Sequence, residues 1–225
     1  MDSPGDVFYL IPGLGADERV FKFLRLRGEV HVLPWLTPES ADEPLAHYAA
    51  RLVAAIPIAK ICYLVGISFG GVLALEAGRL RPLARVVLIS SLASPAELPW
   101  PAGLARITGL HRLVSPQLLR FAPRVVQWFF GAKKATEHQL LQEIMRDTEP
   151  QVARWAIAQL VQWQGLGPQA VVRIHGTADC LLPVGAALSQ HLLPGGHFII
   201  VSQAPEISQI LNRVAAEAAA SSQVA

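Results

Sequence analysis

Short apolar runs alternate along the chain with amphipathic stretches of helical spacing. Each run is almost entirely apolar, whereas a strand with one face in water alternates between apolar and polar residues. We therefore expect strands that are buried on both faces, as in a parallel sheet covered by helices on each side. The six predicted strands are residues 7–11, 29–33, 61–65, 85–89, 170–174 and 198–201.

Residues 94–165 break this alternation, because strand-like runs vanish and prolines separate short segments of helical spacing. We interpret this stretch as a helical lid inserted into a core formed by residues 1–93 and 166–225. The predicted fold class is α/β: a three-layer α/β/α sandwich around a mainly parallel six-stranded sheet, with right-handed crossovers. Trp100, Trp128 and Trp155 of the lid are candidates for substrate contact, although aromatic side chains more often pack a lid onto its core.

Composition narrows the classes of partner. The 225 residues fit one domain, and 19 basic against 17 acidic residues give a formal net charge of +2 without a basic run. Neither nucleic acid nor a membrane surface is therefore expected as a partner, and a small molecule is. The acidic N-terminus lacks the pattern of a signal peptide, which favours a cytoplasmic location. Cys62 and Cys180 have no metal-site spacing, so we expect two reduced thiols, no metal and no cofactor.

The sequence Gly-Ile-Ser-Phe-Gly at 66–70 lies between an apolar strand and a helical run, which is the context of a nucleophile elbow. In such an elbow a strained turn lifts the serine hydroxyl above the sheet, and small neighbours let strand and helix cross closely. A glycine-rich turn with a helix-capping serine is the alternative interpretation. The flanking elements favour Ser68 as a nucleophile.

A serine hydroxyl needs a base to activate it and an acid to orient that base. Asp179 follows the fifth predicted strand and His197 precedes the last one, so Ser68, Asp179 and His197 stand in the chain order of a catalytic triad. Asp179 could instead cap a helix, and His197 could be a surface loop residue. His175 is the rival histidine, for which we expect a supporting or packing role, and Glu97 is the rival acid.

Acyl transfer to such a serine passes through an oxyanion, which two preorganised backbone amides must face. The first is the amide of Phe69, directly after the nucleophile, and we expect the second to be that of Leu14, in the loop after the first strand. Gly13 and Gly15 on either side of Leu14 let the backbone approach a substrate. A phosphate-binding loop is disfavoured because the third glycine of a dinucleotide fingerprint and the lysine of a P-loop are missing.

Together, Pro-Gly-Leu-Gly15, the elbow, His-Gly-Thr-Ala-Asp179 and Gly-Gly-His197 resemble the α/β-hydrolase superfamily over nearly the whole chain, and residues 11–21 are similar to a bacterial subgroup of general hydrolases. The resemblance implies a larger parent sheet whose two leading strands are missing here, hence a trimmed six-stranded core. Pro12 stands where the usual His-Gly pair before the oxyanion residue has histidine. Because the nucleophile is serine and not aspartate, the resemblance implies a serine hydrolase that forms an acyl-serine.

The sequence thus favours a carboxylesterase-like enzyme that cleaves a small or medium, largely apolar carboxylic ester. Two other classes of function remain open. The same triad could serve carbon–carbon bond or thioester hydrolysis or a lyase reaction. Alternatively, the chain could be a receptor-like ligand-binding module with a vestigial triad, since a fold and a grafted site do not guarantee turnover.

Overall fold

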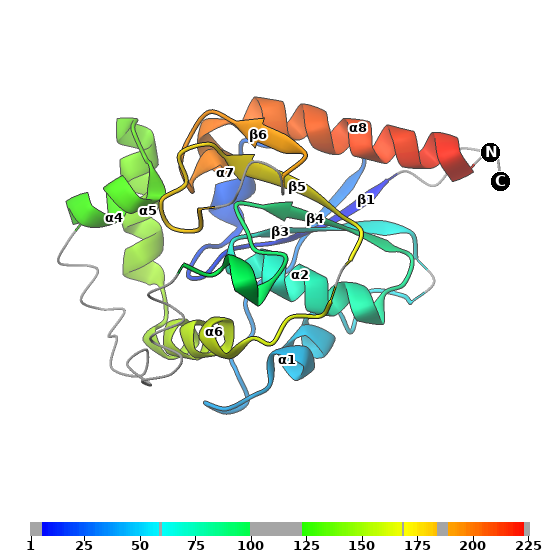
Figure 1. Ribbon diagram of the computed structural model, residues 1–225, viewed down its shortest axis with the longest axis horizontal. Coiled ribbons are helices and arrows are strands. Elements are labelled where there is room, and N and C mark those ends of the chain that lie inside the picture. Colours follow the sequence, from blue (N-terminus) through cyan, green and yellow to red (C-terminus); the bar gives the residue numbers. More distant parts are fainter. Residues whose placement is uncertain (1–5, 59, 100–122, 168, 184–188, 223–225) are drawn as a thin grey trace.

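The computed structural model describes residues 6–58, 60–99, 123–167, 169–183 and 189–222. Within these residues, six parallel strands form one sheet in the order β2-β1-β3-β4-β5-β6 (Figure 1). The predicted α/β class and six-stranded parallel sheet are therefore confirmed. The strands are β1 (Val7–Ile11), β2 (Glu29–Val32), β3 (Cys62–Ile67), β4 (Ala84–Ile89), β5 (Val171–Gly176) and β6 (His191–Leu193).

The last predicted strand is wrong. Residues 198–201 do not pair with the sheet, because Phe198 caps a short helix, α7 (Ile199–Ser202), in which Ile199 and Ile200 are buried. The sixth strand is instead β6, which is three residues long and pairs with β5 at the end of the strand order. A short apolar run does not distinguish a buried strand from a buried helical turn, and a half-exposed edge strand carries little apolar signal.

Helices cover both faces of the sheet, and successive strand residues point to opposite faces. On one face, Tyr9, Ile11 and Leu64 pack against α1 (Leu45–Leu52) and α2 (Phe69–Leu80). On the other face, Phe8, Leu10 and Val65 pack against the 3-10 turn η1 (Glu18–Phe21), α7 and α8 (Ala204–Ser222). Figure 1 shows α8 on one side of the sheet and α1 with α2 on the other, as a three-layer sandwich requires.

Between β4 and β5, where a lid is predicted, lie the 3-10 turn η2 (Pro95–Glu97) and the helices α4 (Pro123–Phe130), α5 (Ala135–Asp147) and α6 (Pro150–Gln162). Helix α6 is anchored on the core through Trp155, whose indole N–H donates to the carbonyl of Glu43 at 2.9 Å and whose ring packs on Tyr48. Helices α4 and α5 lie together at one end of the molecule (Figure 1). The lid function of this segment stays a prediction. Among the helices described, none is both long and apolar enough to cross a membrane.

The crossing of β3 and α2 is too close for side chains at two of its glycines. A Cβ on Gly66 would collide with the carbonyl of Gly70, and a Cβ on Gly70 would collide with the carbonyls of Ile11 and Pro12. All of these obstacles are backbone atoms, which cannot swing away as the end of a side chain can. Because Gly66 and Gly70 have no side chains, β3, α2 and β1 can pack in direct backbone contact, which fixes their relative positions.

We predict that Gly66→Ala lowers the free energy of unfolding by more than about 3 kcal/mol, beyond the usual cost of overpacking, because the obstacle is backbone. Urea unfolding followed by circular dichroism measures the change. Gly167→Ala is the control, since Gly167 has a φ of +74° but no atom within 4 Å of an added Cβ. Its loss should be about 1 kcal/mol, from the left-handed backbone alone. Equal losses in the two variants would contradict the steric explanation.

Candidate active site

Ser68 joins β3 to α2 with a φ of 52° and a ψ of −123°, a backbone conformation that residues other than glycine rarely adopt. Three hydrogen bonds hold it there. The Ser68 amide donates to the carbonyl of Ile89 at 3.0 Å, and the Ser68 carbonyl accepts from the amide of Gly71 at 2.9 Å and the hydroxyl of Ser91 at 2.6 Å. This is the strained elbow that the glycine spacing predicts, and Ser91 is a supporting residue that the sequence pattern did not indicate.

Asp179 and His197 are brought together by the loops after β5 and β6. The amide of Thr177 donates to the carbonyl of Leu193 at 2.9 Å, and the amide of Ala178 donates to that of Gly195 at 2.8 Å. Through these two hydrogen bonds the loop after β5 and the loop after β6 run side by side at the carboxyl ends of the two strands. Residues 18 positions apart in the sequence therefore become neighbours.

His197 Nδ1 lies 2.8 Å from Asp179 Oδ2, and both side chains are buried. A carboxylate oxygen can only accept, so Nδ1 carries the proton and Nε2 is left as the basic nitrogen. The second carboxylate oxygen, Oδ1, accepts the amides of Leu181 at 3.0 Å and Leu182 at 2.9 Å. The pair thus has the geometry of a base oriented by an acid.

The pKa of Asp179 is lowered well below the ordinary range of a carboxyl group. Burial by itself would raise it, but hydrogen bonds from His175 and His197, together with the backbone amide of Leu182, favour the charged form more strongly. Asp179 is therefore ionised at neutral pH, as orienting a histidine requires.

The rival residues have other partners. Glu97 forms a two-pronged ion pair with Arg173, with Nη1 3.1 Å from Oε1, and it also accepts the amide of Ala93. His197 is paired with Asp179 instead. His175 is buried, with Nε2 3.2 Å from Asp179 Oδ2, which agrees with the supporting role expected for it.

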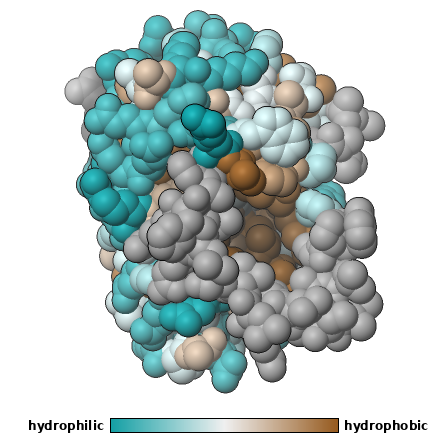
Figure 2. All heavy atoms as spheres, turned by 90° about the vertical axis from the view of Figure 1, so that its left-hand side faces the viewer, coloured by the Kyte–Doolittle hydropathy of each residue, from teal (hydrophilic) through white to brown (hydrophobic). Residues whose placement is uncertain are grey.

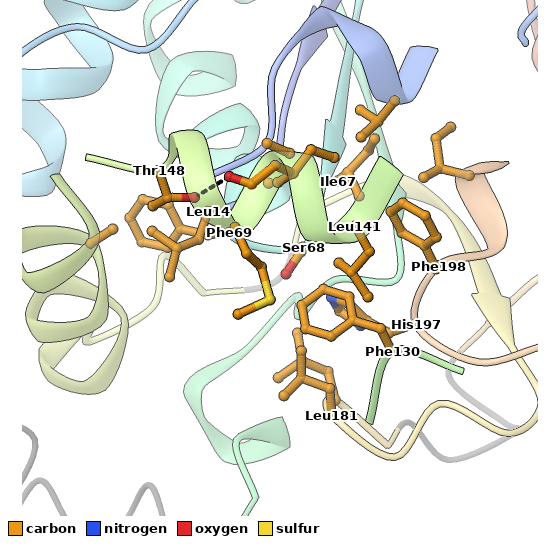
Figure 3. A pocket seen from close by; sticks show the side chains of 18 of the residues that line it. Leu14, Ile67, Ser68, Phe69, Phe130, Leu141, Thr148, Leu181, His197 and Phe198 are labelled. Atoms are coloured by element: carbon orange, nitrogen blue, oxygen red, sulfur yellow. Dashed lines mark hydrogen bonds between the residues drawn. The ribbon is translucent and has the colours of Figure 1, made fainter. Parts of the chain in front are cut away.

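Ser68 and His197 line the same cavity, and Figure 3 shows the serine hydroxyl and the imidazole ring facing into it. Within the described ranges, no hydrogen bond directly joins the two side chains. Hydrogen bonds between catalytic groups are often long in the absence of a ligand and tighten when the substrate is bound. The structure therefore brings the side chains of Ser68 and His197 to one cavity without a direct hydrogen bond between them.

The loop after β1 passes directly beside Ser68. A Cβ on Gly13 would lie 3.2 Å from Ser68 Cβ, and the carbonyl of Gly13 is turned away to accept from the amide of Ala16 and the indole of Trp35. Leu14 and Phe69 both line the cavity. Within the described residues the amide of Leu14 donates to no protein acceptor. The amide of Phe69 belongs to the first residue of α2, a position without an intrahelical acceptor.

The end of α5 contacts this same loop. Thr148, directly after the helix, places its hydroxyl 2.7 Å from the carbonyl of Ile144 and 3.2 Å from that of Gly15. Arg19 of η1, the turn that follows this loop, lies 3.0 Å from Asp147 and pairs with Asp17, the residue that caps η1. The inserted helices are thus bonded to the loop that carries Leu14.

The cavity has a volume of about 320 Å³ and mostly apolar walls, and a hollow with hydrophobic walls is visible in Figure 2. Its described lining includes no Asp, Glu, Lys or Arg, and its polar side chains are those of Ser68, Thr148 and His197. A neutral, apolar group fits such walls, because an unpaired charge there would lose its hydration. Its apolar lining includes residues of α5, of α6 and of the loops that carry Asp179 and His197: Leu141, Ile144, Ile157, Leu160, Leu181 and Phe198.

The tryptophans expected at the substrate do not line this cavity where they are described. Trp155 is buried behind Phe69, with its ring 5.9 Å from the phenyl ring, and so packs α6 on the core. Trp128 of α4 is 65% exposed, and Trp100 lies outside the described residues. Among the described residues between β4 and β5, the aromatic residue that lines the cavity is Phe130, whose ring lies 5.3 Å from that of His197. The helical apolar pattern did not distinguish Phe130 from its neighbours, because the rotation of α4 depends on tertiary packing.

A cation could be shared by Glu39, Glu43 and His47, whose possible ligand atoms lie within 4.8 Å of one another. Arg51 already pairs with Glu43 at 2.9 Å and with Glu39 at 3.2 Å. None of these residues lines the cavity at Ser68. The cluster is therefore an ion-pair network on α1 and the loop before it, apart from the candidate site.

A strained serine after the third strand and a buried Asp–His pair at the same edge of a parallel sheet are features of an α/β hydrolase. The chain belongs to the Alpha/beta hydrolase family, because the model of that family matches residues 8–210. No curated protein sequence matches the chain significantly.

Solved structures with the same fold include esterases. A thermophilic esterase from Thermogutta terrifontis is 16% identical, with a TM-score of 0.69 over 96% of this chain and 91% of that one. A putative aryl esterase from Burkholderia cenocepacia is 15% identical, with a TM-score of 0.67 over 96% and 93%. A meta-cleavage product hydrolase from Pseudomonas fluorescens is 18% identical, with a TM-score of 0.66 over 96% and 92%. At these identities the likeness establishes the fold, and with the family it supports a hydrolase enzyme.

Because the pKa of Asp179 is lowered in the folded state, we predict how the free energy of unfolding depends on pH. Because the folded-state pKa lies below the unfolded value of roughly 4, the charged carboxylate stabilises the fold above that pH, and the contribution is lost as the pH falls through the folded value. The free energy of unfolding of the wild type should therefore decrease more steeply below about pH 4 than that of Asp179→Asn. Urea titrations between about pH 3 and pH 7 test this.

Asp42→Asn controls for the loss of a carboxylate at an exposed position and should follow the wild type. Parallel pH dependences for the wild type and Asp179→Asn would show that Asp179 is not held in its charged form by the fold.

Proposed function

We propose that this hydrolase cleaves a small or medium, largely apolar carboxylic ester through an acyl-serine intermediate. The observation that carries the proposal is the convergence of the strained Ser68 and the His197–Asp179 pair on one apolar cavity. A nucleophile, a base and an orienting acid on different elements rarely meet in a cavity by chance, and perturbed titratable groups there favour catalysis.

In the proposed reaction, His197 Nε2 takes the proton of Ser68 as the serine oxygen attacks the ester carbonyl. The amides of Leu14 and Phe69 bind the oxyanion that forms. His197 then gives the proton to the departing alcohol, which leaves an acyl-serine. A water molecule, deprotonated by the same histidine, attacks the acyl group and releases the acid, and the proton returns to Ser68. Asp179 stays ionised and stabilises the imidazolium in both steps.

The walls of the cavity support a neutral acyl group. A volume of about 320 Å³ lies near the lower end of ligand pockets, which run from roughly 300 to 1,000 Å³. Apart from the catalytic groups, Thr148 is the polar side chain in the described lining, and its hydroxyl is already near two backbone carbonyls. Thioester, carbon–carbon bond and lyase chemistry use the same triad, but no contact in the described cavity favours them over ester hydrolysis.

We predict that the purified protein hydrolyses p-nitrophenyl esters, and that Ser68→Ala lowers kcat/KM by about 10⁴-fold while the residual rate comes from the oxyanion hole. Activity should rise from the acetyl ester to esters of medium chain length and fall once the chain outgrows the cavity. Release of p-nitrophenol, followed by absorbance, gives both results.

Ser94→Ala is the matched control, because it also removes a serine hydroxyl but at the cap of η2, outside the cavity. It should retain wild-type turnover. Wild-type activity in folded Ser68→Ala would overturn the proposal. A folded wild type that binds esters without turnover, with equal affinity in Ser68→Ala, would favour a ligand-binding role.

A further inference from the structure

The carboxylate of Asp179 is in contact with a second histidine that the reaction above does not use. Oδ2 lies 2.8 Å from Nδ1 of His197 and 3.2 Å from Nε2 of His175. His175 is 1% exposed and does not line the cavity, so it cannot meet a substrate there. Any effect of His175 on the reaction must therefore be indirect, through a residue that it contacts.

The geometry assigns the proton on His175. Its Nε2 lies 2.9 Å from the carbonyl of Leu182 as well as 3.2 Å from Asp179 Oδ2, and both oxygens are acceptors. Nε2 must therefore carry hydrogen and share it between them. Because β5 pairs His175 with Leu192 of β6, the backbone of this donor is fixed by the sheet. His175 is thus a rigid hydrogen-bond donor that connects the acid to the loop after it.

We propose that His175 is a positioning residue that acts through Asp179: it fixes the rotation of the carboxylate and limits how strongly Oδ2 attracts the proton on His197. This inference rests on the proposed serine-hydrolase function. The amides of Leu181 and Leu182 already hold Oδ1, so His175 supplies a restraint on the oxygen that faces the catalytic histidine.

The other titratable groups near this pair do not replace His175. Arg173, the next side chain on the same face of β5, is paired with Glu97. His191 of β6 is in register with Ile174 and so lies on the opposite face of the sheet. Cys180 is exposed, and its sulfur lies 3.6 Å from the carbonyl of Ala178. From the described elements packed around Asp179, the side chains that bond to it are therefore His175 and His197.

The consequence should appear in the pH dependence of kcat/KM. A hydrogen bond from His175 withdraws negative charge from Oδ2, and its removal leaves Oδ2 more attractive to an imidazolium. His197 would then lose its proton only at higher pH, so the acid limb of the profile, which reports the free base, should move upward. A residue that only fills space would change the rate or the stability without moving this limb.

The test compares His175→Leu with His175→Gln, using a p-nitrophenyl ester between about pH 5 and pH 9. The side-chain amide of glutamine places an N–H near the position of Nε2, whereas leucine fills the space without a donor. We expect His175→Leu to move the acid limb upward by about 0.5 pH unit and to lower kcat/KM at least tenfold. His175→Gln should restore the position of the limb and most of the rate.

His191→Leu is the control, because it removes a histidine from the neighbouring strand without contact to Asp179, and it should leave the limb in place. If His175→Leu does not fold, His175→Ala, which also removes the donor, replaces it in the same comparison. If turnover needs Ser68 but the acid limb is the same in the wild type, the variant without a donor and His175→Gln, the inference is overturned. If Ser68→Ala keeps the turnover of the wild type, the proposed function itself is overturned.

Discussion

Ser68 keeps a backbone conformation that costs on the order of 1–3 kcal/mol, and the centre of the sheet is built so that it cannot relax. Its amide and carbonyl are bonded to Ile89, Gly71 and Ser91, which belong to the two neighbouring elements and the loop after β4. Gly66 and Gly70 let β3 and α2 cross so closely that an added Cβ at either position would collide with backbone atoms. The position of Ser68 therefore depends on backbone contacts at the centre of the sheet, and the other residues of the candidate site lie around it.

Parallel strands explain why the remaining groups meet at this point. All six strands run in the same direction, so the loops after β1, β3, β5 and β6 all leave the sheet at the carboxyl ends of the strands. Each loop contributes a different group: an available amide, a hydroxyl, a carboxylate and an imidazole. The loops that carry Asp179 and His197 are bonded to each other through their backbones, so the carboxylate and the imidazole meet as one preassembled unit.

The sequence predicted those parts of the molecule whose signal is local. The elbow at 66–70 combines glycines and a strand-helix context, and the buried strands have apolar runs, so both could be identified from neighbouring residues alone. Local signals fail at the last strand, where the buried apolar residues Ile199 and Ile200 belong to the helix α7 and the true edge strand, β6, is only half-buried. The walls of the cavity, and the contact between His175 and Asp179, depend on how separate elements pack, which periodicity does not contain.

The bond between the end of α5 and the loop after β1 has a consequence for how this fold can diverge. Insertions between strands are commonly regarded as exchangeable modules on a conserved scaffold, since surface connections tolerate change. Here Thr148 is bonded to Gly15 and Asp147 is paired with Arg19, next to Leu14, which lines the cavity. An insertion taken from another member of the fold would need residues that form equivalent hydrogen bonds and ion pairs with the loop after β1. Selection on the insertion for new ligands and selection on the scaffold for reactivity would therefore act on the same few residues, so the two parts must evolve together.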